Sequence, residues 1–573
     1  MKKTLALLVS AMLLLACFAG CACSQKADEV ASDAVSAPAW DAYDAKINEI
    51  KTTPDFAARV TMMHEAEDML MDTGAVCPIY YYNDLYMQRS TVEGIYANAY
   101  GFKFLQYATN GDSDTLNIHL ASEPEMLDPA LNTTVDGCVL ALLEFGGLYS
   151  DSAEGYKPNF ADGDPTISED GKTWTIKVKD GLKWSDGSDL TADDFVYSWK
   201  RAAATETAAE YSYMFSAIDG YPDNLNVKAE NNAITVVLGA PCAYFKDLLA
   251  FPTYFPVKQS AVEGAEGYKD ASGAIVKANA WCTDAGFVNC GAFTLTEWNH
   301  ESSMVFTKNP NYWDAENVKL NKITLMLSAD DVAIYAAYKA GDIDFCESVP
   351  SDEILNLKGI DPEFKLLDNL GTYYICFNVN SELFKGMSVE KAAALRKAIA
   401  SAIDRQYIVD TVAQCGQLPA TSWVSAGMAD GNGGIFKDAA AWKYPNGSDG
   451  YFNDADTAGA VKILEDAGFK MKDGKLADEI TVEYLINESS GHQGVAECVQ
   501  QDLAAIGVNI TIHTVDWATF VNERQSGNFD VCRHGWIADF NDPINLLELF
   551  VSDSGNNDAQ LGKDPAAATA AAE

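Results

Sequence analysis

The stretch "GAVCPIYYYNDLYMQRS", residues 74–90, sets three consecutive tyrosines shortly after a Cys-Pro step. Aromatic and β-branched residues favour extended backbone, so the run predicts a short β-strand. In such a strand Tyr80 and Tyr82 share one face, and Tyr81 takes the other. The residues before it have the spacing of a helix: Val60, Met63, Ala66 and Leu70. A helix that leads directly into a strand is typical of an α/β chain.

The alternation of strands and helices continues along the chain. Apolar residues at every second position predict strands near residues 116–120, 174–178 and 293–295. Helical spacing appears at residues 395–403, and "DTAGAVKILEDAGF" predicts a helix that ends on Gly468. The pattern has no internal repeat, which favours α/β lobes over a solenoid or a sandwich.

Composition excludes several classes of protein. The 573 residues leave room for two to four domains. With 83 acidic and 40 basic residues, the formal charge of −43 excludes a general binder of nucleic acid or anionic lipid. The chain lacks the H-E-x-x-H, G-x-S-x-G and P-loop motifs, so we expect no enzyme, no metal site and no cofactor. A hydrolase of exported peptides is a minor alternative.

Residues 1–21, "MKKTLALLVSAMLLLACFAGC", predict an export signal whose apolar run is too short to span a membrane. Its ending "FAGC" resembles a bacterial lipobox, which implies cleavage before Cys21 and a lipid on that thiol. An ordinary signal peptide with an incidental cysteine is the alternative. Residues 22–39 predict a flexible tether and residues 561–573 a disordered tail. We therefore expect an extracytoplasmic protein anchored to the cell membrane by its lipid alone.

The cysteines indicate no metal centre. Of thirteen cysteines, Cys17 leaves with the leader and Cys21 carries the lipid, so an odd number remains. Cys282 and Cys290 are close enough in sequence to form a disulfide, but their spacing has no zinc signature. We expect buried free thiols.

The stretch "GLKWSDGSDLTADDFVYSWKR", residues 181–201, predicts a turn followed by a helix that Thr191 caps, with Asp194 three residues on. Four other blocks accompany it: "TLNIHLASEPEMLDPA", "NCGAFTLTEWNHESSMVFTKNPNYW", "AIASAIDRQYIV" and "FDVCRHGWIADFNDP". Together these blocks resemble the extracytoplasmic solute-binding proteins of peptide and nickel ABC importers, of the oligopeptide-binding family 5 type. The resemblance covers nearly the whole chain after the leader.

The order of the blocks departs from that family. Residues 40–87 resemble the family's last segment, yet here they come first. Joining Gln560 to Trp40 would restore the family pattern as "SGNNDAQWDAYDAKI", so we expect a circular permutation with the usual ends fused at residues 111–113. Adjacent surface termini tolerate such a rearrangement. A rearranged or misassembled gene is the alternative.

The resemblance implies an α/β, bilobal fold of the type II periplasmic-binding-protein kind with an additional inserted subdomain. Lobe I would combine residues 83–144 and 257–370. The inserted subdomain would fill residues 145–256. Lobe II would combine residues 40–82 and 371–560.

A receptor for varied peptides can recognise only their ammonium, their carboxylate and their backbone. The resemblance gives the role of ammonium partner to Asp539 in "GWIADFNDP", because a buried cation needs a carboxylate. A turn or helix-capping aspartate is the alternative. Trp536 and Trp517 would line pockets for ligand side chains. Without the resemblance, each tryptophan would be predicted to lie in the hydrophobic core.

The resemblance also implies polar positions around those pockets. Arg533, Arg524 and His492 would meet acidic side chains or the carboxyl end of a peptide. The alternative for each is a solvated surface charge. Where some family members carry a lysine for the carboxylate of short peptides, this chain has Ala413.

Two strands would cross between the lobes. Tyr374 in one strand and Tyr82 in the other would contact the ligand, with Tyr82 reaching the cleft beside the hinge, which leaves Tyr81 in the core. A disulfide of some members would need cysteines at Gly371 and Ile537, so it is missing here.

The expected function is that of a receptor. Two lobes would close over an oligopeptide and deliver it to an ABC transporter permease, with the energy supplied by a separate ATPase. We expect a monomer without nucleic-acid partners. The alternatives are another solute on the same fold, such as an oligosaccharide or a nickel complex, or a sensor of peptide signals.

Overall fold

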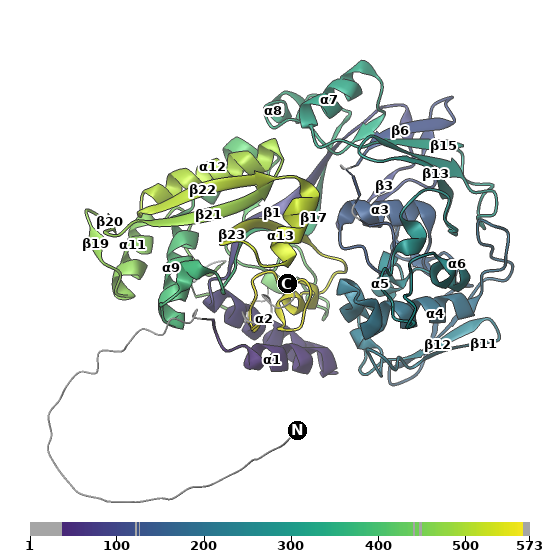
Figure 1. The fold of residues 1–573 in the computed structure, drawn as a ribbon, viewed down its shortest axis with the longest axis horizontal. Helices are drawn as coiled ribbons and strands as arrows, with labels where there is room; N and C mark the ends of the chain where they lie inside the picture. Colours follow the sequence, from purple (N-terminus) through teal and green to yellow (C-terminus); the bar gives the residue numbers. More distant parts are fainter. Residues whose placement is uncertain (1–36, 121–122, 125, 439–441, 446–449, 565–573) are drawn as a thin grey trace, which may run out of the picture.

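The computed structural model describes residues 37–564 apart from 121–122, 125, 439–441 and 446–449. Figure 1 shows two α/β bodies joined by long strands, as the sequence predicts. The predicted export signal, Cys21 and most of the predicted tether lie outside the described residues. Within the described ranges, no helix is long and apolar enough to cross a bilayer.

The two bodies share one eleven-stranded sheet whose centre is an antiparallel pair of strands. β1 (Val76–Gln88) and β17 (Phe364–Phe377) contain 13 and 14 residues. The end of β1 pairs with β16 (Phe345–Cys346) in one lobe, and the end of β17 pairs with β23 (Val531–Ile537) in the other. The prediction of a short tyrosine strand is therefore wrong: at about 3.3 Å per residue, β1 is long enough to link both lobes.

On one side the sheet continues through β6 (Thr115–His119), β15 (Lys322–Met326), β14 (Ser303–Lys308) and β13 (Phe293–Asn299). β6 is parallel to its neighbours β15 and β16. The strands predicted at 116–120 and 293–295 are thus confirmed. α7 (Asp331–Ala340) packs its buried face beside β16.

On the other side the sheet continues through β21 (Ile480–Asn487) and β22 (Val508–Val515), both parallel. Helices α9 (Val389–Ala402), α11 (Thr457–Asp466) and α12 (Ser490–Ala504) cover it. The predicted helices are confirmed, and α11 ends as expected before a left-handed glycine, Gly468, with φ of +76°.

Residues between β7 (Tyr149–Ser150) and α6 (Gln259–Gly264) form a separate layer with its own small sheet (Figure 1). Its strands are β11 (Val227–Glu230), β12 (Ala233–Val237), β10 (Thr173–Lys177) and β9 (Thr166–Ile167). α4 (Ala192–Ala203) packs against it. Its predicted cap is present, since the Thr191 backbone N–H donates to Asp194 Oδ2 at 2.8 Å.

The remaining elements are short. The strands are β2 (Val92–Glu93), β3 (Tyr96–Ala97), β4 (Lys103–Phe104), β5 (Thr109–Asn110), β7 (Tyr149–Ser150), β8 (Lys157–Pro158), β18 (Leu418–Pro419), β19 (Met471–Lys472) and β20 (Lys475–Leu476). The helices are α3 (Val135–Glu144), α5 (Phe245–Leu248), α6 (Gln259–Gly264), α8 (Ile354–Leu357), α10 (Arg405–Ile408), α13 (Trp517–Gln525) and α14 (Ile544–Leu547).

The first helices pack on the last part of the chain. α1 (Asp41–Thr52) and α2 (Phe56–Asp72) lie beside α14 (Figure 1). The indole of Trp40 donates to the Phe550 carbonyl at 2.6 Å, and the Tyr43 hydroxyl donates to the Leu547 carbonyl at 2.7 Å. The first and last described segments therefore share one core.

The predicted tail begins later than residue 561. Leu561 is fully buried, its N–H donates to Asn557 Oδ1 at 3.1 Å, and Gly562 lies against Trp40. Residues 565–573 lie outside the described residues. The ten described cysteines are all free thiols, and Cys282 and Cys290 are buried as expected.

Ile50 tests whether α1 belongs to the core. Its side chain is fully buried, so Ile50→Ala is expected to lower the free energy of unfolding by about 2–5 kcal/mol. Ile360→Ala is the matched control at a position that is 72% exposed, and it is expected to change stability by about 0.5 kcal/mol or less. Urea unfolding followed by tryptophan fluorescence measures both. Equal effects would show that α1 is not an integral part of the fold.

Candidate functional site

A cleft of about 1080 Å³ lies beside the crossing strands β1 and β17. Its wall comes from both lobes: His119 of β6 and Asp331 of α7 on one side, and Tyr82 of β1, His492 of α12 and Trp517 of α13 on the other. Ligand sites in proteins commonly measure about 300–1,000 Å³. The cleft is therefore large enough for a ligand of several residues.

Three of the predicted site residues line this cleft: Tyr82, His492 and Trp517. The ring of Tyr82 meets that of Tyr80 edge to face, with 5.7 Å between centroids, so both face the cleft as the strand pattern predicts. The Tyr373 hydroxyl lies 3.3 Å from His492 Nδ1. Burial, and then the charge of Arg533, lowers the pKa of His492 well below its ordinary value.

Tyr81 points away from the cleft, as expected. Its side chain is 7% exposed, and its hydroxyl lies 2.8 Å from Ser422 Oγ. The Lys437 ammonium lies over the Tyr81 ring at 4.5 Å. Tyr81 therefore anchors β1 to residues 418–437.

Arg533 and Arg524 have different surroundings. Arg533 lies behind the cleft wall, where its Nε donates to Asn487 Oδ1 at 2.6 Å and its guanidinium stacks 5.4 Å from the Trp517 ring. Arg524 forms a buried ion pair with Asp558 at 2.9 Å and does not line the cleft. The predicted ligand contact of Arg524 is thus replaced by an internal one.

Trp536 and Tyr374 are also off the cleft lining. The Trp536 ring stacks on Tyr211, with 6.0 Å between centroids. Tyr374 is 1% exposed and stacks on His534 at 4.7 Å. Contrary to the prediction, Tyr374 belongs to the core because its face of β17 points away from the cleft.

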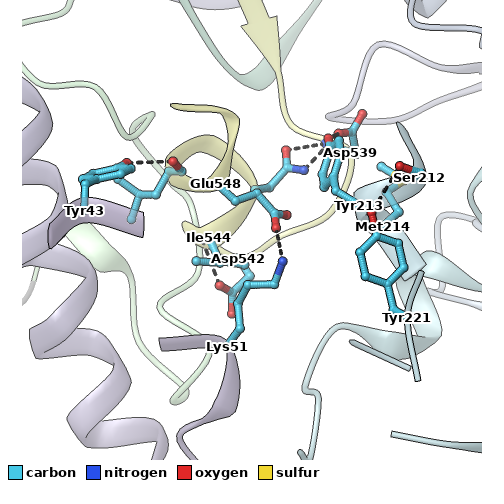
Figure 2. A network of polar contacts seen from close by, with 12 residues as sticks. Tyr43, Lys51, Ser212, Tyr213, Met214, Tyr221, Asp539, Asp542, Ile544 and Glu548 are labelled. Carbon is cyan, nitrogen blue, oxygen red and sulfur yellow. Dashed lines mark hydrogen bonds and ion pairs between the residues drawn. The ribbon is translucent and has the colours of Figure 1, made fainter. Parts of the chain in front are cut away.

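Asp539 is not among the residues that line the cleft, but it follows Ile537, which does line it, by two residues in the chain. The Asn545 amide donates to Asp539 Oδ2 at 2.9 Å, and the Tyr211 hydroxyl lies 3.5 Å from a carboxylate oxygen of Asp539. The Tyr213 hydroxyl lies 3.5 Å from the other carboxylate oxygen (Figure 2). Burial raises the pKa of Asp539 from 3.8 to about 7. All three side-chain contacts are neutral donors.

The loop that carries Asp539 is held by cations from the first two helices. Lys51 of α1 pairs with Glu548 at 2.7 Å (Figure 2), and Arg59 of α2 binds Asp542 through two hydrogen bonds of 2.9 Å. Each of these buried charges is paired with an opposite charge, which offsets the free-energy cost of removing it from water. Of the three carboxylates in this loop, Asp539 alone has no cation within the described residues.

One charged group of the cleft was not predicted. Lys103 is 1% exposed and pairs with Asp84 at 2.5 Å and with Glu347 at 2.6 Å. Burial alone lowers the pKa of Lys103, but the two carboxylates outweigh it and hold the pKa above its ordinary value. The signal was a lysine inside the aromatic run "YGFKFLQY", since a charge there must be paired when buried.

Contacts across the cleft hold the two lobes together. Ser490 at the start of α12 donates to Asp331 of α7 at 2.5 Å. Away from the cleft lining, Tyr244 stacks on Phe540 with 4.3 Å between centroids. The structure therefore describes the two bodies of the fold in contact with each other. Among the described residues, no group of three or more His, Cys, Asp or Glu side chains is arranged to hold a metal ion.

Comparison with known proteins identifies the family. The family model described as bacterial extracellular solute-binding proteins, family 5 (middle region), matches residues 155–558. The chain belongs to this family. Family 5 proteins bind solutes outside the cytoplasm and are not enzymes.

Individual family 5 relatives agree with this assignment. The chain is 31% identical to the oligopeptide-binding protein OppA of Bacillus subtilis (strain 168), over 79% of this chain and 80% of the relative. It is 32% identical to the periplasmic oligopeptide-binding protein OppA of Salmonella typhimurium (strain LT2), over 79% and 80%. The structure of Listeria monocytogenes OppA bound to peptide matches with a TM-score of 0.67 at 28% identity, over 78% of this chain and 86% of that one.

The raised pKa of Asp539 predicts a specific pH dependence in the ligand-free protein. Because the folded state holds this proton more tightly than the unfolded chain, the stability it contributes is complete below pH 4 and is lost as the pH rises through 7. Asp539→Asn cannot titrate. Between pH 4 and 8 the unsubstituted protein should lose about 4 kcal/mol more stability than this variant.

Urea unfolding at a series of pH values measures the difference. Asp473→Asn, at an exposed position, is the matched control and should follow the unsubstituted protein. If the free energy of unfolding changes with pH equally in Asp539→Asn and in the unsubstituted protein, the raised pKa of Asp539 is wrong.

Proposed function

We propose that the protein captures oligopeptides in the cleft between its lobes and delivers them to the permease of an ABC transporter. Two relatives at 31% and 32% identity are oligopeptide-binding proteins, and a structural neighbour is an OppA bound to peptide, which supports a peptide ligand. The volume of the cleft suits a ligand of several residues.

One observation carries the proposal. Asp539 is 8% exposed and meets only neutral donors, although Asp542 and Glu548 in the same loop each have a cation. A buried carboxylate without a cation is the partner that the free amino end of a peptide requires. The ammonium would displace the long contacts from Tyr211 and Tyr213, and Asp539 would then ionise.

The other end of the peptide would face Arg533. Its Nε is bound to Asn487, while a guanidinium has four further N–H donors on its two terminal nitrogens. A carboxylate that reaches past Trp517 would meet these donors directly or through water. The peptide backbone between the two ends would bind in an extended form, as in receptors where the bound peptide pairs like an additional β-strand.

Closure of the two lobes over the peptide would allow the permease to distinguish the loaded protein from the empty one. A peptide held by both lobes stabilises the closed arrangement by its extra affinity for that state. The permease would recognise the closed lobes, and a separate ATPase would supply the energy. The protein would act as a monomer held at the membrane by a lipid on Cys21.

Removing the charge of Asp539 tests the amine contact. Asp539→Asn is expected to weaken binding of a pentapeptide with a free amino end at least about thirtyfold, because the peptide ammonium would be left without its counter-charge. The same pentapeptide with an acetylated amino end should bind both proteins weakly and equally. Isothermal titration calorimetry gives all four affinities. Unchanged affinity of Asp539→Asn for the free-amine peptide would reject the assignment.

We also propose that the chain is a circular permutant of its family. Trp40 lies against Gly562, so the family's order is restored by a short connection. The fused ends would be the turn at residues 111–113, where Gly111 has φ of +53° and the Ser113 N–H donates to the Asn110 carbonyl at 2.8 Å. Alignments that cover four fifths of both chains are what an in-order comparison gives when one segment has changed place.

Restoring the family's order tests the permutation. A chain that starts at Asp112, runs to Asp564, and continues through a short Gly-Ser linker to residues 37–111 should keep the free energy of unfolding within about 1 kcal/mol. A control opened between Tyr81 and Tyr82 breaks the crossing strand β1 and should fail to fold. The reordered chain that starts at Asp112 interrupts no strand of the sheet. If it fails to fold, the proposed permutation is wrong.

A further inference from the structure

The charge on the wall of the cleft is far more one-sided than the charge of the chain. The whole chain has about two acidic residues for each basic one, whereas the described lining holds eight carboxylates and a single lysine. Two of the carboxylates, Glu301 and Glu488, are exposed and form no ion pair among the described residues. Glu301 follows β13, and Glu488 follows β21, so they approach the cleft from different lobes.

Four further carboxylates of the wall have no lysine or arginine partner among the described residues. Asp331 accepts a hydrogen bond from Ser490 across the cleft at 2.5 Å. Glu123 accepts from His300 Nδ1 at 2.6 Å, and Asp516 caps the start of α13. Asp136 lines the cleft at the start of α3. These contacts fix the carboxyl groups in place and bring no permanent positive charge.

The lysine of the wall is not available to a ligand. Its ammonium is bound by Asp84 and Glu347, and the side chain is 1% exposed. An anionic ligand group would have to compete with two carboxylates that are already in place. Lys103 therefore offers no free positive charge to a ligand.

The two imidazoles of the wall add no charge. Burial, and then Arg533, lowers the pKa of His492, and burial lowers that of His119. Arg533 lies behind Trp517 and is not among the lining residues. Within the described lining, Glu301 and Glu488 therefore have no compensating cation.

An independent observation points to a polar ligand in the cleft. Asn369 lines it, is 4% exposed, and neither its amide nitrogen nor its oxygen has a partner in the described part of the chain. His119 Nδ1 is likewise buried without a partner. Buried polar groups in proteins are nearly always hydrogen-bonded, so these atoms are suited to the backbone amides of a bound peptide.

We infer that the preferred ligands are cationic oligopeptides, whose interior lysine or arginine side chains face the carboxylates of the cleft. This inference rests on the proposed function, and it adds what that function leaves open, the kind of peptide. Asp539 would bind the amino end, Arg533 the carboxyl end, and Glu301 and Glu488 the cations between them. Like charges repel in a site with few mobile ions, so peptides with interior glutamates are disfavoured.

A matched set of pentapeptides tests the inference. Each has alanines, free ends and one variable residue at position 2, 3 or 4, which is lysine, norleucine or glutamate. Norleucine has the shape of lysine without its ammonium, so the comparison isolates the charge. Calorimetry with the full chain should show, at one position or more, lysine about tenfold tighter than norleucine and glutamate about tenfold weaker. Both differences should shrink at high salt.

Variants of the protein assign the effect to the cleft. Glu301→Gln combined with Glu488→Gln should reduce the preference for lysine over norleucine severalfold and leave the norleucine affinity unchanged. Glu465→Gln, on the outer face of α11, is the matched control and should keep the full preference. A preference that survives the double substitution undiminished would overturn the role of these two residues.

The outcomes separate this inference from the proposed function. Equal binding of the three peptides at every position would overturn the inference and leave the peptide receptor intact. Failure of all the peptides to bind would overturn both. Spermidine, a cation without peptide bonds, is included as a competitor; if it binds as tightly as the lysine peptides, the ligand is a free polyamine and the inference is wrong.

Discussion

The antiparallel pairing of β1 with β17 is the constraint on which the rest of the structure depends. These two strands carry the sheet from one lobe into the other, and they form the floor beside the cleft. Because side chains alternate along a strand, the pairing decides that Tyr80 and Tyr82 face the cleft while Tyr81 contacts Ser422. A slip of one residue would exchange these faces and remove the tyrosines from the site.

The second organising feature is the pairing of buried carboxylates with cations from distant parts of the chain. Arg59 and Lys51, from the first helices, neutralise Asp542 and Glu548 near the end of the chain. These pairs join segments separated by nearly the full length of the sequence, so the contacts are kept whichever segment comes first. Asp539 is left without a cation among the described residues, and we propose that a ligand's ammonium completes the pattern. The wall of the cleft likewise has few cations, with one lysine among its described lining residues against eight carboxylates.

Local patterns in the sequence predicted the elements well, and non-local contacts explain the failures. The helical cap at Thr191, the glycine after α11 and the period of two in β1 depend on neighbours within a few residues, so they could be predicted. The pairing of Arg524 with Asp558 could not, because it depends on how the segment after α14 folds back. Leu561 was assigned to a loose tail for the same reason: its partner Asn557 and the nearby Trp40 come together only in the folded chain.

The site residues also divide into those that the sequence could identify and those that depend on non-local contacts. Resemblance to the family identified Tyr82, His492 and Trp517, which line the cleft, and also Tyr374, which the fold turns into the core. Lys103 and Asn369 carry no motif, and their importance is visible only from the groups around them.

The most direct test of the account is a crystal structure of the protein with a bound peptide that has a free amino end. The account predicts the peptide nitrogen within hydrogen-bond distance, about 3 Å, of a carboxylate oxygen of Asp539. A bound peptide whose amino end lies elsewhere, with Asp539 still held by Asn545, Tyr211 and Tyr213 alone, would contradict it.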